Sequence, residues 1–203
     1  NVSSFNQSVN VTGNTYVLML QQVSGLTSCG LLDLPNTVYT VGANITAGAD
    51  CFNISASNIV LNFQGFSIIG VSNTTANLEA INSTGGHNNL TIRDGFLVGW
   101  LRAVNLGNVF NFTIYNMTFY NVSNGVDTLQ LQNATAASAL NVSRNHFTLI
   151  HTDAFYCSNW NNVTFVNNTA YNLSKSITTT WNDDGTCNAT ISENLFRDSN
   201  LSV

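Results

Sequence analysis

Residues 111–119 read NFTIYNMTF, and residues 162–170 read NVTFVNNTA. In the first of these stretches apolar and polar side chains alternate, which is typical of a β-strand that buries one of its two faces. Related stretches recur along the chain: NIVLNFQGF from Asn58, NLTIRDGFL from Asn89, LNVSRNHF from Leu140 and NATISENLF from Asn188. The pattern predicts a chain built from short β-rich repeats.

The repeats align on one apolar anchor residue in the middle of each stretch. The anchors are Leu61, Ile92, Ile114, Val142, Phe165 and Ile191. Asn stands three residues before every anchor except Val142. Five residues after the anchors come Phe66, Leu97, Phe119, Phe147, Ala170 and Phe196. We therefore expect the anchors and these second positions to occupy equivalent places in successive repeats.

A second strand follows four of the anchors at a constant distance of twelve residues. Its central residues are Val104, Val126, Ala154 and Ile177. The return to the next anchor varies from 10 to 16 residues. Two strands joined by a constant corner, followed by a loop that tolerates insertions, describe one coil of a parallel β-solenoid. We assign residues 26–203 to this domain and residues 1–25 to an amino-terminal cap or inter-subunit strand.

Eighteen Asn residues open an Asn-x-Ser/Thr triplet, which is the acceptor for N-linked sugar. They are Asn1, Asn6, Asn10, Asn44, Asn53, Asn73, Asn82, Asn89, Asn111, Asn116, Asn121, Asn133, Asn141, Asn162, Asn167, Asn172, Asn188 and Asn200. This number exceeds what chance placement gives, so the sequence predicts a secreted glycoprotein. Stacked Asn side chains also form ladders along a solenoid corner. That reading applies to Asn89, Asn111, Asn162 and Asn188, which are the weakest of the predicted acceptors.

The composition limits the partners of this chain. Apolar residues make up 44% of the chain and charged residues only 7%, with a formal net charge of −5. A nucleic-acid partner requires a basic patch, so we expect none. The longest apolar run, residues 16–20, is far shorter than the ~18 residues of a membrane span.

Four cysteines are an even number, as expected for disulfides in an oxidising compartment. Each of two pairs brackets a segment of about one coil, which predicts the disulfides Cys29–Cys51 and Cys157–Cys187. Their spacing matches no zinc pattern. We expect no metal, and no cofactor other than covalently attached sugar.

Residues 28–70, SCGLLDLPNTVYTVGANITAGADCFNISASNIVLNFQGFSIIG, resemble the opening coils of right-handed parallel β-helix proteins. These proteins carry parallel-β-helix repeats and occur among secreted and surface proteins of archaea and other microbes. The resemblance extends over about residues 28–198. It implies an all-β fold, a right-handed parallel β-helix of about six to eight coils. It leaves the function open, because such solenoids include polysaccharide lyases, hydrolases, adhesins, surface-layer parts and fibre subunits.

An enzyme that cleaves polysaccharides requires carboxylates for acid–base chemistry, and a lyase also requires a basic residue. The candidates for these roles are Asp127, His151, Asp153, Asp183, Asp184, Arg102 and Arg144. HTDAF from His151 and NDDG from Asn182 weakly resemble segments of pectin-type glycoside hydrolases, but the accompanying Gly-His and Arg-x-Lys segments have no counterpart here. Six aromatic residues are candidates for a sugar-binding platform or for core filling: Trp100, Trp160, Trp181, Tyr115, Tyr120 and Tyr171.

These features favour a structural subunit of an extracellular, heavily N-glycosylated filament or surface layer, with no catalytic residues. The carboxyl end stops inside a coil, whereas the amino end carries the apolar segment 16–20. Two different end surfaces predict head-to-tail contact between copies of this chain. The alternatives are a polysaccharide-acting β-helix enzyme and a carbohydrate-binding adhesin.

Overall fold

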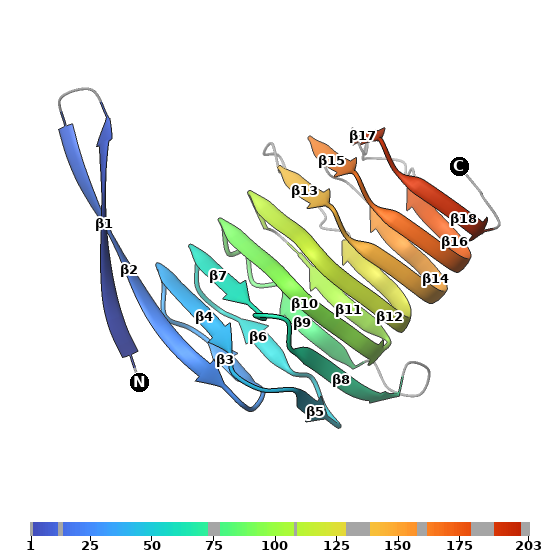
Figure 1. Ribbon diagram of the computed structural model, residues 1–203, viewed down its shortest axis with the longest axis horizontal. Helices are drawn as coiled ribbons and strands as arrows, with labels where there is room; N and C mark the ends of the chain where they lie inside the picture. The colour runs from blue at the N-terminus through green and yellow to red at the C-terminus, as the bar shows by residue number, and fades with distance from the viewer. Residues whose placement is uncertain are drawn as a thin grey trace.

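The computed structural model describes residues 2–11, 14–72, 78–107, 109–128, 139–157, 162–179 and 189–199. These residues form strands and no helix, so the all-β prediction is confirmed. Figure 1 shows a curled sheet of stacked strands whose colours run in chain order from the amino-terminal end to the carboxyl-terminal end. Neighbouring strands therefore come from successive repeats of the sequence.

The strands have the following bounds: β1 (Val2–Val11), β2 (Asn14–Leu26), β3 (Gly30–Leu32), β4 (Thr37–Val41), β5 (Ile45–Ala47), β6 (Phe52–Ile54), β7 (Ile59–Asn62), β8 (Ser67–Ser72), β9 (Glu79–Ser83), β10 (Leu90–Trp100), β11 (Arg102–Leu106), β12 (Phe112–Thr128), β13 (Leu140–Ser143), β14 (His146–Cys157), β15 (Val163–Val166), β16 (Thr169–Thr179), β17 (Ala189–Ser192) and β18 (Leu195–Ser199). One repeat contains one long strand or two to three shorter ones. Strands of successive repeats pair in parallel, as β10 pairs with β12 and β12 with β14.

The register of the predicted anchors is confirmed across six strands. Leu61 pairs with Ile92, Ile92 with Ile114, and the series continues through Val142, Phe165 and Ile191. All of these side chains are fully buried except Ile191, which is 44% exposed in the last described repeat. The anchors thus form one continuous apolar row inside the curled sheet.

Phe66 does not occupy the second predicted position. Ile68 pairs with Leu97 in its place. A turn at Gln64 and Gly65 lengthens this repeat by two residues, and the backbone N–H of Phe66 donates to the carbonyl of Phe63 within it. The other residues of this row pair as expected, from Leu97 through to the last repeat.

Ala154 is likewise displaced from its predicted place. Phe155 pairs with Val126 on one side and with Ile177 on the other. The register shifts just before this point in β14, so this repeat contains one additional residue between the two strand positions. Phe155 is fully buried and packs against Phe165 with ring centroids 5.4 Å apart.

The amino-terminal segment forms a hairpin. β1 pairs with β2 in antiparallel orientation, and Figure 1 shows this hairpin extending beyond the stacked strands. The end of β2, residues 21–26, runs parallel to β4 and so contributes the first strand of the stack. The division of the chain at residue 25 stays a prediction.

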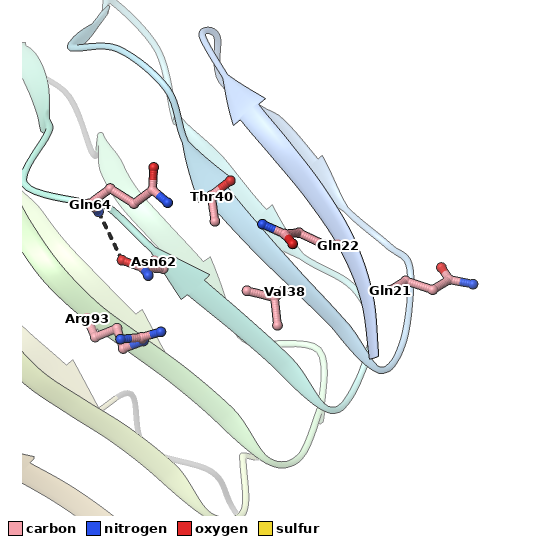
Figure 2. A pocket seen from close by; sticks show the side chains of 7 residues that line it. All are labelled: Gln21, Gln22, Val38, Thr40, Asn62, Gln64 and Arg93. Carbon is pink, nitrogen blue, oxygen red and sulfur yellow. Dashed lines mark hydrogen bonds between the residues drawn. The ribbon is translucent and has the colours of Figure 1, made fainter. Parts of the chain in front are cut away.

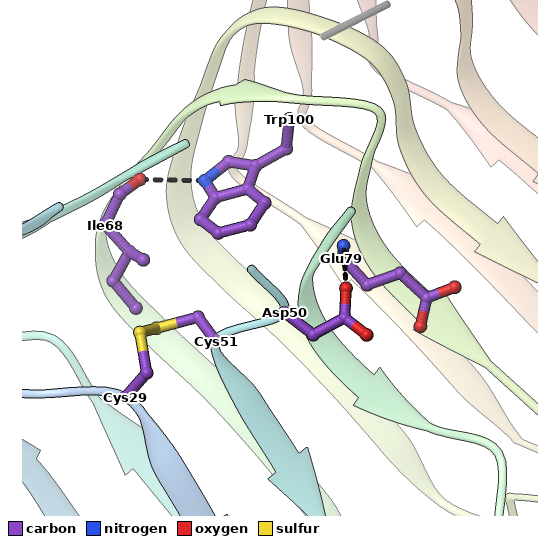
Figure 3. Close-up of a disulfide and its surroundings, with 6 residues drawn as sticks. All are labelled: Cys29, Asp50, Cys51, Ile68, Glu79 and Trp100. Carbon is purple, nitrogen blue, oxygen red and sulfur yellow. Dashed lines mark hydrogen bonds between the residues drawn. A yellow bond between two sulfur atoms is a disulfide. The ribbon is translucent and has the colours of Figure 1, made fainter. Parts of the chain in front are cut away.

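A disulfide joins Cys29 to Cys51, with Cα atoms 4.5 Å apart, which confirms the first predicted pairing. Each cysteine directly precedes one of two paired strands, β3 and β6, so the bridge ties successive repeats together. Figure 3 shows it near Trp100, whose buried ring donates from Nε1 to the carbonyl of Ile68 at 3.1 Å. The predicted pairing of Cys157 with Cys187 lies outside the described residues.

Three Asn side chains form a ladder inside the sheet that the sequence pattern did not reveal. Asn145 and Asn168 are buried, and Asn194 follows them in the next repeat. The Oδ1 atom of Asn168 accepts hydrogen bonds from the backbone N and the Nδ2 atom of Asn145, at 2.9 and 3.1 Å. Its Nδ2 atom donates to the carbonyl of Val142 at 2.9 Å and to Oδ1 of Asn194 at 3.1 Å. The side chain thus satisfies backbone groups at a bend in the core.

Replacing Asn168 by Ala should lower the free energy of unfolding by about 3 kcal/mol, because the substitution leaves several buried polar groups without partners. Urea denaturation followed by circular dichroism measures this loss. Asn141→Ala is the matched control, since Asn141 is exposed, and it should change stability by less than about 0.5 kcal/mol. Equal losses in both variants would contradict the role assigned to the inner ladder.

Candidate functional site

Most repeats turn at residues whose backbone is left-handed, and in three of them three such bends follow one another at five-residue intervals. In β12 they are Asn111, Asn116 and Asn121, with φ of 55°, 54° and 53°. In the repeat of β15 and β16 they are Asn162, Asn167 and Asn172, with φ of 57°, 56° and 51°. Asn is one of the few residues other than Gly that adopts this conformation readily. We call the three positions the first, second and third bends.

The acceptor triplet matches the geometry of a bend. After Asn111, the side chain of Phe112 is buried and that of Thr113 is half-buried. The strand alternation therefore directs the middle residue of the triplet inward and the Thr outward. A bend followed by a strand thus favours Asn-apolar-Thr for structural reasons alone. This explains part of the abundance of triplets in the chain.

An Asn ladder runs along the first bend, as the sequence predicted for Asn89 and Asn111. Nδ2 of Asn58 donates to Oδ1 of Asn36 at 2.8 Å, and Nδ2 of Asn89 donates to Oδ1 of Asn58 at 2.7 Å. Nδ2 of Asn111 continues the series to Oδ1 of Asn89 at 3.0 Å. These side chains are exposed, so the ladder does not prevent attachment of sugar.

The structure describes the side chains of eleven acceptor Asn residues, and none of them is buried. Nine are exposed and two, Asn82 and Asn121, are half-buried. The exposed ones are Asn44, Asn53, Asn89, Asn111, Asn116, Asn141, Asn162, Asn167 and Asn172. The buried Asn residues of the described chain are Asn105, Asn145 and Asn168, and none opens a triplet. The remaining acceptor side chains lie outside the described part: Asn1, Asn6, Asn10, Asn73, Asn133, Asn188 and Asn200.

Most of the charge in the middle of the chain gathers at one place. Arg102 donates from Nε to Oδ2 of Asp127 at 3.0 Å, and its second contact is Oε1 of Glu79 at 3.4 Å. Nδ2 of Asn105 bonds Oε1 of Glu79, and Nδ2 of Asn124 donates to Oδ2 of Asp127 at 3.0 Å. We call these five residues the polar cluster. Each carboxylate has a contact with Arg102 and one with an Asn amide.

Glu79 has a perturbed carboxyl group within the polar cluster. Burial raises the pKa of its carboxyl above the usual 4.5, and the nearby Asp50 raises this pKa further. The hydrogen bond from Asn105 and the charge of Arg102 act in the opposite direction. Oε2 of Glu79 is buried without a hydrogen-bond partner. Figure 3 shows Asp50 accepting from the backbone N of Glu79, at 2.8 Å.

The other candidate catalytic residues are dispersed. His151 is exposed and its Nε2 contacts Oδ1 of Asn121 at 2.9 Å. Arg144 is exposed at a second bend, with φ of 56°. Asp153 is buried in register with Asn124, while Asp183 and Asp184 lie outside the described residues. Within the described ranges no group of three or more His, Cys, Asp or Glu side chains is arranged to hold a metal ion.

A shallow groove of about 240 Å³ crosses β2, β4, β7 and β10 (Figure 2). It is lined by Gln21, Gln22, Val38, Thr40, Asn62, Gln64 and Arg93. A second groove of about 300 Å³ crosses β12, β13 and β15. Register places Asn62, Arg93 and Tyr115 in one row that passes through both. Amide, hydroxyl and guanidinium groups of this kind suit a ligand rich in hydroxyl groups.

The aromatic candidates have different environments. Trp100 is fully buried and serves as core filling. Tyr120 is exposed, whereas Tyr115 and Tyr171 are half-buried. Trp160 and Trp181 lie outside the described residues. These positions do not make one continuous aromatic platform among the side chains that the structure describes.

No family model, curated protein or solved structure matches this chain. Among the described residues, no helix is long and apolar enough to cross a membrane. The resemblance to parallel-β-helix-repeat proteins therefore stays a prediction, and function must be argued from the residues themselves.

Replacing Glu79 by Gln should flatten the pH dependence of stability. A raised pKa means that the folded protein holds this proton more tightly than the unfolded chain, so Glu79 destabilises the fold as pH rises through its raised pKa. Between the pKa of Glu79 in the unfolded chain and its raised pKa in the folded protein, the stability of Glu79→Gln relative to the parent should rise with pH. Above the raised pKa it should level off. Urea denaturation between about pH 4 and 8 measures it. Glu193→Gln, at an exposed position, controls for the loss of one negative charge. A difference in stability between Glu79→Gln and the parent that stays constant with pH would contradict the raised pKa of Glu79.

Leu149 occupies a third bend with φ of 56°, where a branched side chain is strained. Leu149→Asn should therefore raise the free energy of unfolding by about 1 kcal/mol. Leu149→Ala is the matched control, because it removes the side chain but keeps the unfavourable backbone. Thermal and urea unfolding of the three proteins give the comparison. Lower stability of Leu149→Asn than of Leu149→Ala would contradict the bend rule.

Proposed function

We propose that this protein is a structural subunit of an extracellular, heavily N-glycosylated filament or surface layer, built on a right-handed parallel β-helix of six to eight coils. The observation that carries this proposal is that every described acceptor Asn has an exposed or half-buried side chain. The bends account for the triplets that begin at them. They do not account for those at Asn44, Asn53, Asn82 and Asn141, which have no left-handed backbone and still present their side chains outward.

The pairing register of the strands and the bends support the helical path that we propose for the chain. Parallel strands of successive repeats pair over most of the described chain, and each pairing requires a crossover connection. Such connections are almost always right-handed. Three bends within one repeat, as at Asn111, Asn116 and Asn121, turn the chain by stages. Closure of each repeat into a full coil belongs to the proposal.

An extracellular location is supported by the disulfide between Cys29 and Cys51, because such bonds persist in oxidising compartments. It is also supported by the scarcity of charge. Charged residues make up 7% of the chain, against about a quarter in typical domains. Hydrophilic sugar on outward-facing Asn supplies the hydration that charged side chains supply elsewhere.

Self-assembly is supported by two unlike surfaces. β1 pairs with β2 along one of its two edges. The other edge of β1 offers backbone N–H and C=O groups for further pairing. Ile191 and Leu195, in the last described repeat, are 44% and 41% exposed. Contact between non-identical surfaces is heterologous and generates open filaments unless the rotation closes a ring.

A carbohydrate-binding adhesin is the second candidate, and the groove across β2, β4, β7 and β10 is the observation that favours it. The polar cluster gives less support to a polysaccharide-acting enzyme. Arg102 pairs with both carboxylates, Glu79 and Asp127, and thereby reduces their freedom to act as acid or nucleophile.

Electron microscopy of the natively glycosylated protein tests assembly. The full-length protein should form filaments, and a variant lacking residues 1–20 should not. That deletion removes β1 and most of the part of β2 that pairs with it, but keeps residues 21–26, which pair with β4. Circular dichroism and thermal unfolding should show that the truncated protein is folded. Filaments from the truncated protein, or a full-length protein that sediments only as a monomer at high concentration, would contradict head-to-tail assembly.

A further inference from the structure

Six acceptor Asn residues occupy all three bends of two repeats. They are Asn111, Asn116 and Asn121 in β12, and Asn162, Asn167 and Asn172 in the repeat of β15 and β16. Five are exposed and Asn121 is half-buried. The residue after each one is buried: Phe112, Met117, Val122, Val163, Asn168 and Leu173. Each acceptor thus stands at an outward turn directly before a side chain fixed in the interior.

The repeat between these two carries no acceptor at its bends. Its residues at the three positions are Ala139, Arg144 and Leu149. Neighbouring strands of a sheet lie about 4.8 Å apart, so acceptors two repeats apart are separated by roughly 10 Å. A sugar ring with its hydroxyl groups is wider than one strand spacing. Acceptors in alternate repeats therefore have room for sugar at the same time.

The first bend provides a contrast within the same molecule. Asn89 and Asn111 belong to adjacent repeats and are joined by a side-chain hydrogen bond of 3.0 Å. Asn89 is also bonded to Asn58 on its other side, at 2.7 Å. The next position beyond Asn111 is Ala139, which carries no amide side chain. Sugar on Asn111 therefore excludes sugar on Asn89.

The hydrogen bonds at the acceptors are compatible with glycosylation. Nδ2 of Asn116 donates to Oδ1 of Asp94 at 2.7 Å, and His151 contacts Oδ1 of Asn121. Attachment requires an activated sugar donor: the bond from the anomeric carbon to its leaving group breaks, the bond from that carbon to Nδ2 forms, and one of the two Nδ2 hydrogens leaves as a proton. The second hydrogen and Oδ1 are retained, so neither contact has to be lost.

The geometry points to two glycan collars, each made of three N-linked sugars on the bends of one repeat: Asn111, Asn116 and Asn121 in the first, and Asn162, Asn167 and Asn172 in the second. The second and third bends nearer the amino terminus, at Gln64, Asp94 and Gly99, have no acceptor, whereas the first bend before β10 carries Asn89. The groove across β2, β4, β7 and β10 therefore lies on a part of the surface outside the collars. This inference rests on the proposed glycosylation and names the sites that carry it.

Glycopeptide mass spectrometry of the secreted, full-length protein tests the collars. Thr118→Val and Thr164→Val remove the triplets of Asn116 and Asn162 while leaving both bend residues in place. Each variant should lose one glycan relative to the parent, at the corresponding Asn. Thr118→Ser and Thr164→Ser preserve the triplets and should keep the parental pattern. Circular dichroism of each variant should show an unchanged fold.

The parent protein should carry sugar at four or more of the six collar sites, and no molecule should carry it on both Asn89 and Asn111. Sugar confined to Asn44, Asn53, Asn82 and Asn141 would overturn the collars but leave the proposed glycoprotein in place. Joint occupancy of Asn89 and Asn111 would overturn the spacing argument that supports the collars. A protein without any N-linked sugar would overturn both the collars and the proposed function.

Discussion

A left-handed backbone at five-residue intervals is the constraint on which the rest of this structure depends. A residue other than Gly in this conformation costs roughly 1–2 kcal/mol, and Asn is among the few that tolerate it. Asn therefore recurs at the bends, as at Asn116 and Asn167. At Asn111, Asn116, Asn162 and Asn167 the next side chain lies in the core and the following one is half-buried. The same local geometry thus sets the strand alternation, the stacking register and the positions of the acceptor triplets.

Asn side chains form hydrogen bonds in two different environments of this structure. Exposed Asn residues at the first bend bond one another along the stack, as Asn89 does with Asn58 and Asn111. Buried ones, represented by Asn145 and Asn168, bond the backbone of neighbouring repeats. Charge has a small part in this arrangement, apart from the cluster around Arg102 and the ion pair between Arg93 and Asp94. Amide ladders and apolar rows carry the stacking, and the acceptor Asn side chains that the structure describes lie on the outer surface.

Much of the stack was predictable because the same pairing recurs at each anchor. The row from Leu61 to Ile191 followed from the apolar residue in the middle of each repeat, which Asn precedes by three residues at every anchor except Val142. Ile68 and Phe155 were missed because a two-residue turn and a one-residue register shift leave no trace in the apolar pattern. The inner ladder had a usable signal, since Asn145 stands three residues after its anchor, as do its partners in the next two repeats. For the polar cluster, Arg102 and Asp127 were named as candidates from the sequence, but their pairing with Glu79 was not, because it joins residues from different repeats.

An experimental density map of the natively glycosylated protein, at a resolution that shows individual side chains, tests the central claim most directly. The account predicts stacked parallel strands with left-handed Asn at the three bends of each collar repeat, and sugar density extending outward from those Asn side chains. Bends with ordinary right-handed or extended backbone at Asn116, Asn121, Asn167 and Asn172, or Asn side chains turned into the core there, would contradict it.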